Sequence, residues 1–181
     1  KVIVCTDSQK ILSLVKSYGG EAMITKKSHK NGTERIAEVA RKFSAKLIVD
    51  IQGDEPLIQP KHIDHVVRFH LKNPSFDLVI PSSNLTDPKS KNIVKIVATK
   101  KNKILYLSRA SIPFEFKSKA IFKKHLSIIT FKPMALQKYS KLPKSNLEKI
   151  EDIELLRAIE NEMNVGTVFV DSKSVSVDIK E

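Results

Sequence analysis

Hydrophobic residues in the first half of the chain follow two alternating spacings. Apolar runs of strand length occur at residues 2–5, 22–24, 47–51 and 78–80. Between them, apolar side chains recur every three or four residues, as on one face of a helix, at residues 11–18, 33–43 and 60–71. Alternating strands and helices are typical of a mostly parallel central sheet with helices on both faces, and we predict that α/β fold.

Local signals place several element boundaries in this half. Gly19 and Gly20 are expected to end the first helix, because glycine favours the positions that follow a helix. Thr33 suits the N-cap of the second helix, and Pro60 suits the first turn of the third. Pro81 is expected to stop the strand at residues 78–80.

The second half has a different pattern. Apolar runs at residues 93–99 and 103–107 flank a polar tripeptide, which predicts an antiparallel hairpin. The remaining expected elements are a strand at 125–131, a short helix at 133–139, one amphipathic helix at 147–162, and strands at 165–170 and 175–179. We therefore predict a single α/β domain over residues 1–181, with an inserted antiparallel subregion at about residues 93–131.

Composition places the chain among ordinary globular proteins. It has 181 residues, of which 41% are hydrophobic and 29% are charged. No apolar run is long enough to cross a bilayer and no signal peptide is recognisable, so we expect no membrane insertion. The single cysteine, Cys5, cannot form an internal disulfide, which fits a reducing compartment, and we expect a cytoplasmic protein.

The net charge of +12 raises the question of nucleic-acid binding. Only five of the 32 basic residues are arginines, and no nucleic-acid recognition motif accompanies the lysines. Tryptophan is absent, and the aromatic residues do not alternate with basic ones as in a base-stacking surface. We therefore expect no nucleic-acid partner, and note that a positive field also favours an anionic small substrate.

The sequence Gln-Gly-Asp-Glu-Pro at residues 52–56 directly follows a buried strand. Open α/β sheets bind ligands at the carboxyl ends of their strands. Asp54 can offer a carboxylate to Mg²⁺, which takes its other oxygen ligands from phosphate and water. An acidic turn that caps the helix beginning at Pro60 explains the same residues, and both interpretations stay open.

Four further positions carry a functional and a structural interpretation. Asp178 lies inside an apolar run, where it either faces solvent or lines a site. Gly32, Thr33 and the neighbouring Arg35 open a helix, where they either bind an anion or base edge or simply cap the helix. Arg109 is either a clamp for a carboxylate or a surface residue. His125 begins an apolar strand, where a core histidine is more common than a ligand.

Strings spread over nearly the whole chain resemble one family. They are VIVCTD (2–7), HKNGTERIAEV (29–39), VDIQGDEPLI (49–58), NIVKIV (92–97), ILYLSRASIP (104–113), KHLSIITF (124–131), LEKIEDIELLR (147–157) and VSVDIKE (175–181). In this order, and with QGDEP and SRAxIP the most specific, they are similar to the 3-deoxy-manno-octulosonate cytidylyltransferases, or CMP-Kdo synthetases.

The resemblance implies a nucleotide-diphospho-sugar transferase fold and a cytidylyltransferase reaction. CTP and the acidic sugar Kdo would give CMP-Kdo, a lipopolysaccharide precursor, and pyrophosphate, through attack of the anomeric hydroxyl on the α-phosphorus. It also implies a homodimer that forms through the antiparallel region. The implied roles are magnesium binding and catalysis for Asp54 and Asp178, nucleotide binding for Gly32, Thr33 and Arg35, and sugar binding for Gln52, Arg109, His125 and Glu154.

The chain departs from the family pattern on the sugar side. Ser127 and Ile129 stand where the family has Gly and Tyr, and Leu155 stands where it has Gln. Lost hydrogen-bonding groups affect discrimination strongly, so the sugar remains open. Another acidic sugar, such as an amino-Kdo or a nonulosonic acid, is an alternative substrate. A non-catalytic nucleotide-sugar-binding domain is an alternative function.

Family members also begin with a strand and a basic, glycine-containing loop that holds the triphosphate. No such string is present in the sequence, which opens at Lys1 on a strand that resembles a later part of the family. We therefore expect that this chain alone lacks the phosphate loop and does not catalyse nucleotidyl transfer.

Overall fold

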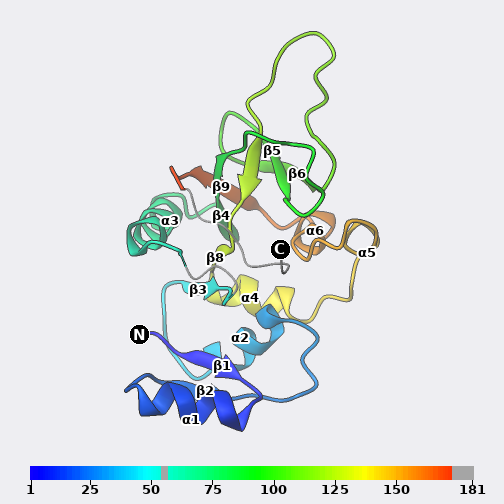
Figure 1. The fold of residues 1–181 in the computed structure, drawn as a ribbon. Coiled ribbons are helices and arrows are strands. Elements are labelled where there is room, and N and C mark those ends of the chain that lie inside the picture. Colours follow the sequence, from blue (N-terminus) through cyan, green and yellow to red (C-terminus); the bar gives the residue numbers. More distant parts are fainter. Residues whose placement is uncertain (54–56, 173–181) are drawn as a thin grey trace.

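The computed structural model describes residues 1–53 and 57–172. The chain begins with a small parallel pair, β1 (Val4–Thr6) and β2 (Ala22–Ile24), joined by helix α1 (Gln9–Ser17). Ser8 caps α1, and Gly19 adopts a φ of 75° just after it, as the glycine signal predicts. This unit lies beside α2 at one end of the molecule (Figure 1).

Helix α2 (Gly32–Ala40) begins one residue earlier than predicted. Its N-cap is Asn31, whose side-chain oxygen accepts a hydrogen bond from the Glu34 N–H at 2.8 Å. The prediction of Thr33 as the N-cap is therefore wrong. Thr33 lies in the first turn with 1% of its surface exposed, so its hydroxyl is directed to the protein interior.

The large sheet contains seven strands. They are β3 (Ile48–Ile51), β4 (Leu78–Asn84), β5 (Lys95–Ala98), β6 (Ile104–Ser108), β7 (Lys123–His125), β8 (Ile128–Phe131) and β9 (Val165–Phe169). Their order is β3-β8-β4-β7-β5-β6, and β9 pairs with β4. The β4–β9 pair is parallel, and every other described pair in this sheet is antiparallel.

The prediction of a mostly parallel sheet is therefore wrong. β3 and β4 do run in the same direction, as expected of strands joined by a helix, but they are not neighbours. β8 lies between them and is antiparallel to both. A strand that arrives from 50 residues farther along the chain thus replaces the expected parallel contact, while the α/β class and the helices on both faces are observed.

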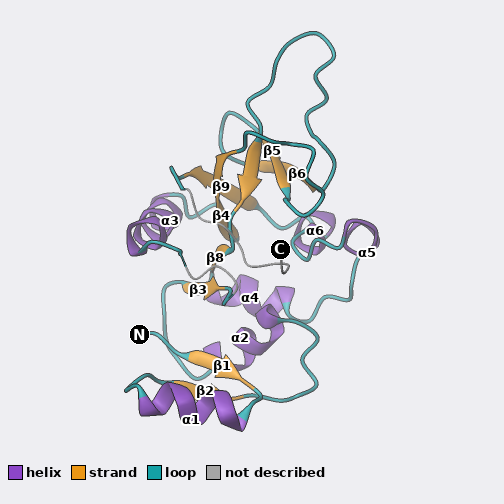
Figure 2. Cartoon of the chain, viewed as in Figure 1, coloured by secondary structure: helices purple, strands orange, loops and turns teal. Residues whose placement is uncertain are grey.

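Helix α3 (Pro60–Lys72) covers one face of the large sheet, where Val66, Phe76, Val79, Leu126 and Val168 form a core. The other face is covered by α2, α4 (Pro133–Tyr139), α5 (Asn146–Glu151) and α6 (Leu156–Glu160). The larger core lies on this second face. Figures 1 and 2 show α3 on one side of the sheet and α5 and α6 on the other.

Strand β4 continues through Pro81, which was predicted to stop it. Proline removes one N–H from the ladder, and β4 tolerates this because it changes partner there. It pairs with β8 at Leu78 and Val79 and with β7 from Ser82 onward. The predicted strand at residues 125–131 is accordingly two strands, β7 and β8.

The hairpin predicted in the middle of the chain is present as the antiparallel pair β5–β6. The segment between β6 and β7 extends away from the body as a long loop (Figure 1). Its apolar side chains Phe114, Phe116 and Ile121 are strongly exposed.

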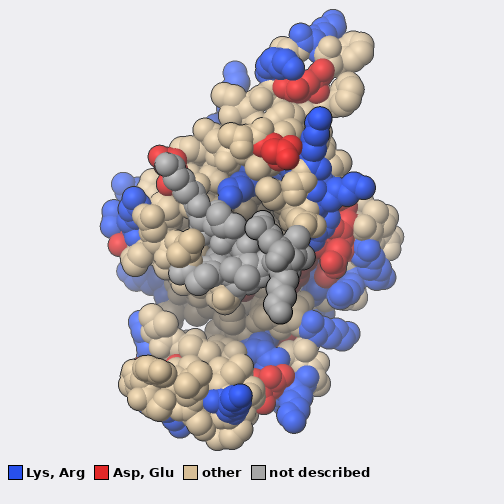
Figure 3. All heavy atoms as spheres, viewed as in Figure 1, with Lys and Arg blue, Asp and Glu red and all other residues tan. Residues whose placement is uncertain are grey.

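Within the described ranges, no helix combines the length and the apolar character that a membrane crossing requires. Basic side chains are spread over the face in Figure 3, and acidic ones lie among them.

Candidate active site

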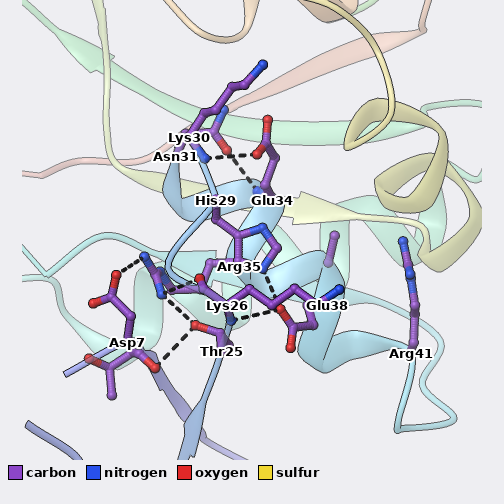
Figure 4. Close-up of polar contacts among 12 residues, drawn as sticks. Asp7, Thr25, Lys26, His29, Lys30, Asn31, Glu34, Arg35, Glu38 and Arg41 are labelled. Carbon is purple, nitrogen blue, oxygen red and sulfur yellow. Dashed lines mark hydrogen bonds and ion pairs between the residues drawn. The ribbon is translucent and has the colours of Figure 1, made fainter. Parts of the chain in front are cut away.

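Arg35 fixes the start of α2 to the carboxyl ends of the two parallel strands. Its Nη2 donates to Asp7 Oδ2 at 2.9 Å, and its Nη1 donates to the Thr25 hydroxyl at 2.5 Å. Asp7 follows β1 and Thr25 follows β2 (Figure 4). The planar guanidinium thus bridges both strand ends and the helix, and its cation lies at the edge where open α/β sheets bind ligands.

The loop between β2 and α2 folds back on the helix through Glu38. The Glu38 carboxylate contacts His29 Nε2 and accepts the Lys26 N–H at 3.2 Å. These two hydrogen bonds hold the pKa of Glu38 below its usual value, and the one with His29 has the larger effect. Figure 4 shows the result, in which the loop presents the Lys30 side chain beside the start of α2.

Thr33 joins a second group of side chains, which contains two carboxyl groups. Its hydroxyl donates to Asp50 Oδ2 at 3.3 Å, and Asp50 lies on β3 with 3% of its surface exposed. Burial, and then the charge of Glu154, raise the pKa of Asp50 to about 6. Glu154 precedes α6, and the Tyr139 hydroxyl donates to its backbone carbonyl at 2.8 Å and lies 3.1 Å from its Oε1. Burial also raises the pKa of Glu154, although the nearby hydroxyls of Thr33 and Tyr139 oppose the shift.

Sequence reasoning did not single out Asp50. The signal was present, because an aspartate inside the apolar run Leu-Ile-Val-Asp-Ile is unusual unless it has a partner. The structure thus brings together two predicted site residues, Thr33 and Glu154, and adds Asp50 and Tyr139 to them.

Arg109, which follows β6, hydrogen-bonds the backbone of two other segments, residues 91–92 and 151–152. Its Nε donates to the Glu151 carbonyl at 2.8 Å, and its Nη2 donates to the Asp152 carbonyl at 3.0 Å. Its Nη1 donates to the carbonyls of Lys91 and Asn92, at 3.1 and 3.4 Å. Among the described residues, all three guanidinium nitrogens therefore donate to backbone oxygens. Its predicted role as a sugar-acid clamp stays a prediction.

Lys95 supports the same region from inside the protein and was also missed by sequence reasoning. It is fully buried in β5, and its Nζ donates to the carbonyls of Ser90, Ile93 and Arg109 at 2.5, 2.9 and 2.6 Å. Burial, and then the nearby Arg109 cation, lower the pKa of Lys95. A lysine at the centre of Ile-Val-Lys-Ile-Val was the available signal.

We expect Arg109→Lys to lower the free energy of unfolding by about 1–3 kcal/mol, because an ammonium group cannot reach carbonyls on both sides as the planar fork does. Urea unfolding of the variant measures this change. Arg41→Lys is the control, since Arg41 Nε makes one exposed hydrogen bond to Gln137. A variant that keeps wild-type stability and shows only a higher sugar KM would contradict the structural role and favour direct sugar binding.

His125 lies in β7, with its ring inside the protein. Burial lowers its pKa to about 4, so the ring is neutral at pH 7. Its Nδ1 has no hydrogen-bond partner among the described residues. The same is true of the hydroxyl of Ser82, the residue of β4 that is paired with His125 of β7. This ring therefore keeps an unused polar atom that a ligand or water can bind.

The remaining predicted residues divide into three groups. Gln52 is exposed after β3, and its N–H donates to the Ser127 carbonyl at 3.3 Å. Ile129 and Leu155 are buried in the larger hydrophobic core, so their side chains pack there. The predicted magnesium ligands Asp54 and Asp178 lie outside the described residues.

Comparisons with known proteins identify relatives over nearly the whole chain. The family model described as Cytidylyltransferase matches residues 1–165. A 3-deoxy-manno-octulosonate cytidylyltransferase of Leptospira biflexa is 36% identical, over 98% of this chain and 74% of the relative. One from Chlamydia trachomatis is 39% identical, over 99% of this chain and 73% of the relative.

A solved structure has the same fold. It is that of CMP:2-keto-3-deoxy-manno-octonic acid synthetase complexed with CTP, with a TM-score of 0.94 and 31% identity. The match covers 98% of this chain and 75% of the solved one. With the family model and the curated relatives, it shows that the chain belongs to the 3-deoxy-manno-octulosonate cytidylyltransferase family.

Proposed function

We propose that this protein is a cytidylyltransferase that forms CMP-Kdo and pyrophosphate from CTP and 3-deoxy-manno-octulosonate. The observation that carries the proposal is the agreement, at a TM-score of 0.94 over 98% of the chain, with a CMP-Kdo synthetase structure complexed with CTP. CMP-Kdo is a lipopolysaccharide precursor, so the product would enter lipopolysaccharide synthesis. A cytoplasmic location is part of the same proposal.

The nucleotide side of the site is built around the start of α2. The Thr33 hydroxyl is engaged inside the protein, so we assign nucleotide contacts to the backbone at Gly32 and Thr33. Backbone N–H groups at a helix start attract anions and base edges. Arg35 contributes positive charge beside them and is held rigidly by Asp7 and Thr25.

Magnesium is the proposed cofactor, with Asp54 and Asp178 as its carboxylate ligands. Asp54 follows β3, and the contact between Asp50 and Thr33 brings the end of this strand against the first turn of α2. That neighbourhood suits a cation which must meet the nucleotide phosphates. When bound, magnesium would offset the negative charge of the phosphates and of the leaving pyrophosphate.

The sugar side contains groups that can hydrogen-bond hydroxyls and a carboxylate. The neutral His125 ring has an unused nitrogen, and Glu154 offers a carboxylate held by Tyr139. Gln52 is exposed and lies close to Asp54 in the sequence, and the Arg109 guanidinium is held by backbone carbonyls. We assign these four residues to sugar binding and orientation, which would place the anomeric hydroxyl for attack on the α-phosphorus.

The test is pyrophosphate release by the complete protein with magnesium. CTP with Kdo is expected to give turnover at least about 100-fold above CTP with other acid sugars, because sites that hydrogen-bond hydroxyls discriminate strongly. Turnover with an amino-Kdo or a nonulosonic acid instead would identify a sister enzyme. Nucleotide binding without turnover on any sugar would favour a non-catalytic nucleotide-sugar-binding domain.

We also propose a homodimer that forms through the loop between β6 and β7. Phe114 and Phe116 are each 82% exposed and project on one loop, and such apolar surface is typical of an interface. A second copy is the proposed partner, because one self-complementary patch suffices for a two-fold dimer.

The double variant Phe114→Ser, Phe116→Ser is therefore expected to convert a dimer into a monomer at micromolar concentration. Sedimentation velocity measures the change. Ile150→Ser is the matched control, since Ile150 is 78% exposed but lies on α5. A dimer that persists in the double variant, or a monomeric parent protein, would exclude this interface.

A further inference from the structure

The loop that joins β2 to α2, residues 25–31, is held by side chains of the helix that follows it. Glu38 lies three residues after Arg35 and four after Glu34, so the three side chains occupy neighbouring positions on the surface of α2. Each of them hydrogen-bonds a different part of the loop, as Figure 4 shows. The shape of the loop therefore depends on the side chains of α2.

Glu38 holds this loop at two points with one carboxylate oxygen. Its Oε2 accepts the Lys26 N–H at 3.2 Å, near the start of the loop, and contacts Nε2 of His29, near its end. An ionised carboxylate has no hydrogen to donate, so both partners donate to it and His29 carries a hydrogen on Nε2. The His29 and Glu38 side chains are 16% and 26% exposed, so water competes only in part for their contact.

The position of His29 gives this contact an effect on the start of the helix. His29 lies two residues before the N-cap Asn31, whose side-chain oxygen accepts the Glu34 N–H at 2.8 Å. The first N–H groups of a helix have no partner within the helix, so their orientation decides what they can bind. A fixed His29 fixes the direction from which the chain enters α2, and with it the N–H groups at Gly32 and Thr33.

We propose that Glu38, acting through His29, is a positioning residue for the nucleotide. This role rests on the proposed function, because that function places a nucleotide at the start of α2. A loop that already has its bound conformation loses little conformational freedom when the ligand arrives, so affinity is higher than with a mobile loop. The Thr33 hydroxyl is held separately by Asp50, so the effect is expected on the nucleotide and not on the sugar.

Two variants at Glu38 test this role in the complete protein with magnesium. Alanine removes both hydrogen bonds, whereas glutamine keeps a side-chain oxygen that can accept them. Glu38→Ala is expected to raise the CTP KM and the CTP Kd about tenfold, through the cost of ordering the loop, and to change the sugar KM by less than about twofold. Glu38→Gln is expected to recover most of the CTP affinity, because the hydrogen bonds and not the charge hold the loop.

His29→Ala tests whether Glu38 acts through the imidazole ring. If it does, His29→Ala raises the CTP KM about as much as Glu38→Ala, and the double variant raises it no further, because the second change removes a contact that is already lost. Independent effects would instead multiply to about 100-fold in the double variant. Such multiplication would overturn the pairing of the two residues.

Glu21→Ala is the matched control. Glu21 directly precedes β2, at the opposite end of this strand from the loop, and it forms an exposed ion pair with Lys1 at 2.8 Å. Its removal takes one carboxylate from the same part of the molecule without touching the loop. The CTP KM of Glu21→Ala is expected to equal that of the parent protein.

Trypsin cleavage measures the loop without sugar or turnover. The loop contains Lys26, Lys27 and Lys30, and trypsin cleaves after lysine. In Glu38→Ala the loop is expected to open more often, so cleavage at these lysines should be at least about fivefold faster than in the parent protein. CTP with magnesium should slow this cleavage. Mass spectrometry identifies the cleaved bonds, and cleavage at lysines of the large sheet reports global unfolding.

These measurements distinguish a failure of the positioning role from a failure of the proposed function. An unchanged CTP KM in Glu38→Ala, or an equal rise in the sugar KM, would overturn the positioning role. Unchanged cleavage of the loop would overturn the hold of Glu38 on residues 26–30. Faster loop cleavage in Glu38→Ala, combined with a parent protein that binds no CTP, would overturn the proposed function and with it the nucleotide role.

Discussion

Replacing Glu148 by alanine is expected to lower the free energy of unfolding by about 3–5 kcal/mol, since it leaves a buried cation without its partner. Glu148 and Arg157 are both buried. Arg157 Nε donates to Oε2 at 2.8 Å and Nη2 donates to Oε1 at 2.5 Å, a bidentate geometry. The guanidinium also lies 5.0 Å from the centre of the Tyr139 ring, so its position affects the neighbouring Glu154 as well.

Urea unfolding at pH 7 measures this effect, and Asp64→Ala is the control. Asp64 forms an exposed pair with Arg68 at 3.4 Å, and such pairs contribute only about 0.3–0.5 kcal/mol. A loss at Glu148→Ala no larger than that of the control would show that solvent reaches the Arg157 guanidinium and replaces the carboxylate.

The pH dependence of the same pair has a definite sign. Burial opposes the ionised form of Glu148, but hydrogen bonds from Arg157 and from the Ser145 N–H outweigh it, so the pKa of Glu148 is lowered. A lowered carboxylate pKa adds stability above the unfolded value of about 4.3, and this stability is lost as the pH falls through the folded value. The wild type and Glu148→Ala should therefore become more similar in stability as the pH falls below about 4.

Elements whose boundaries depend on residues adjacent in the sequence were predicted well. The strand at residues 22–24 and the helix at 133–139 have the predicted bounds, and α3 begins at Pro60 as expected. Proline and short apolar runs act locally, so no knowledge of the fold is required. The sheet order was not predictable in this way, because β8 enters between β3 and β4 from a distant part of the chain.

The helix predicted at residues 147–162 shows the same limit. Its apolar spacing is regular, yet α5 ends at Glu151 and Asp152 adopts a φ of 51°. The Glu151 carboxylate binds the Ser108 hydroxyl and the Arg109 N–H, and the Arg109 side chain takes the carbonyls of Glu151 and Asp152. Tertiary hydrogen bonds from a residue 42 positions away thus end the helix and create the turn that carries Glu154.

The candidate site was predictable in its motifs but not in its internal support. Family resemblance identified Thr33 and Glu154, whereas Asp50 and Lys95, which are charged residues within apolar strands, were not singled out. Such a residue is either solvent-exposed or partnered inside, and the pattern alone does not decide between these. The partners come from other segments, so the structure was needed to decide.

Asp54→Asn and Asp178→Asn are each expected to lower turnover of the complete protein by about 100-fold to 1,000-fold. Asparagine keeps the shape of aspartate but removes the charge that makes it a ligand for Mg²⁺. Metal stabilisation of a transferring phosphoryl group is worth several kcal/mol, and each 1.36 kcal/mol is tenfold in rate. The magnesium concentration needed for half-maximal rate should rise in both variants, because a lost ligand weakens metal binding as well as catalysis.

The control for this pair is Asp64→Asn, which changes an exposed aspartate on α3 whose ion pair with Arg68 is weak. It should keep both the turnover and the magnesium dependence of the parent protein. Melting temperatures of all three variants show whether a loss of rate reflects unfolding. If Asp54→Asn or Asp178→Asn turns over at the wild-type rate with an unchanged magnesium requirement, that residue is not a magnesium ligand. The metal would then have to be held by other oxygens of the protein, or by the phosphates alone.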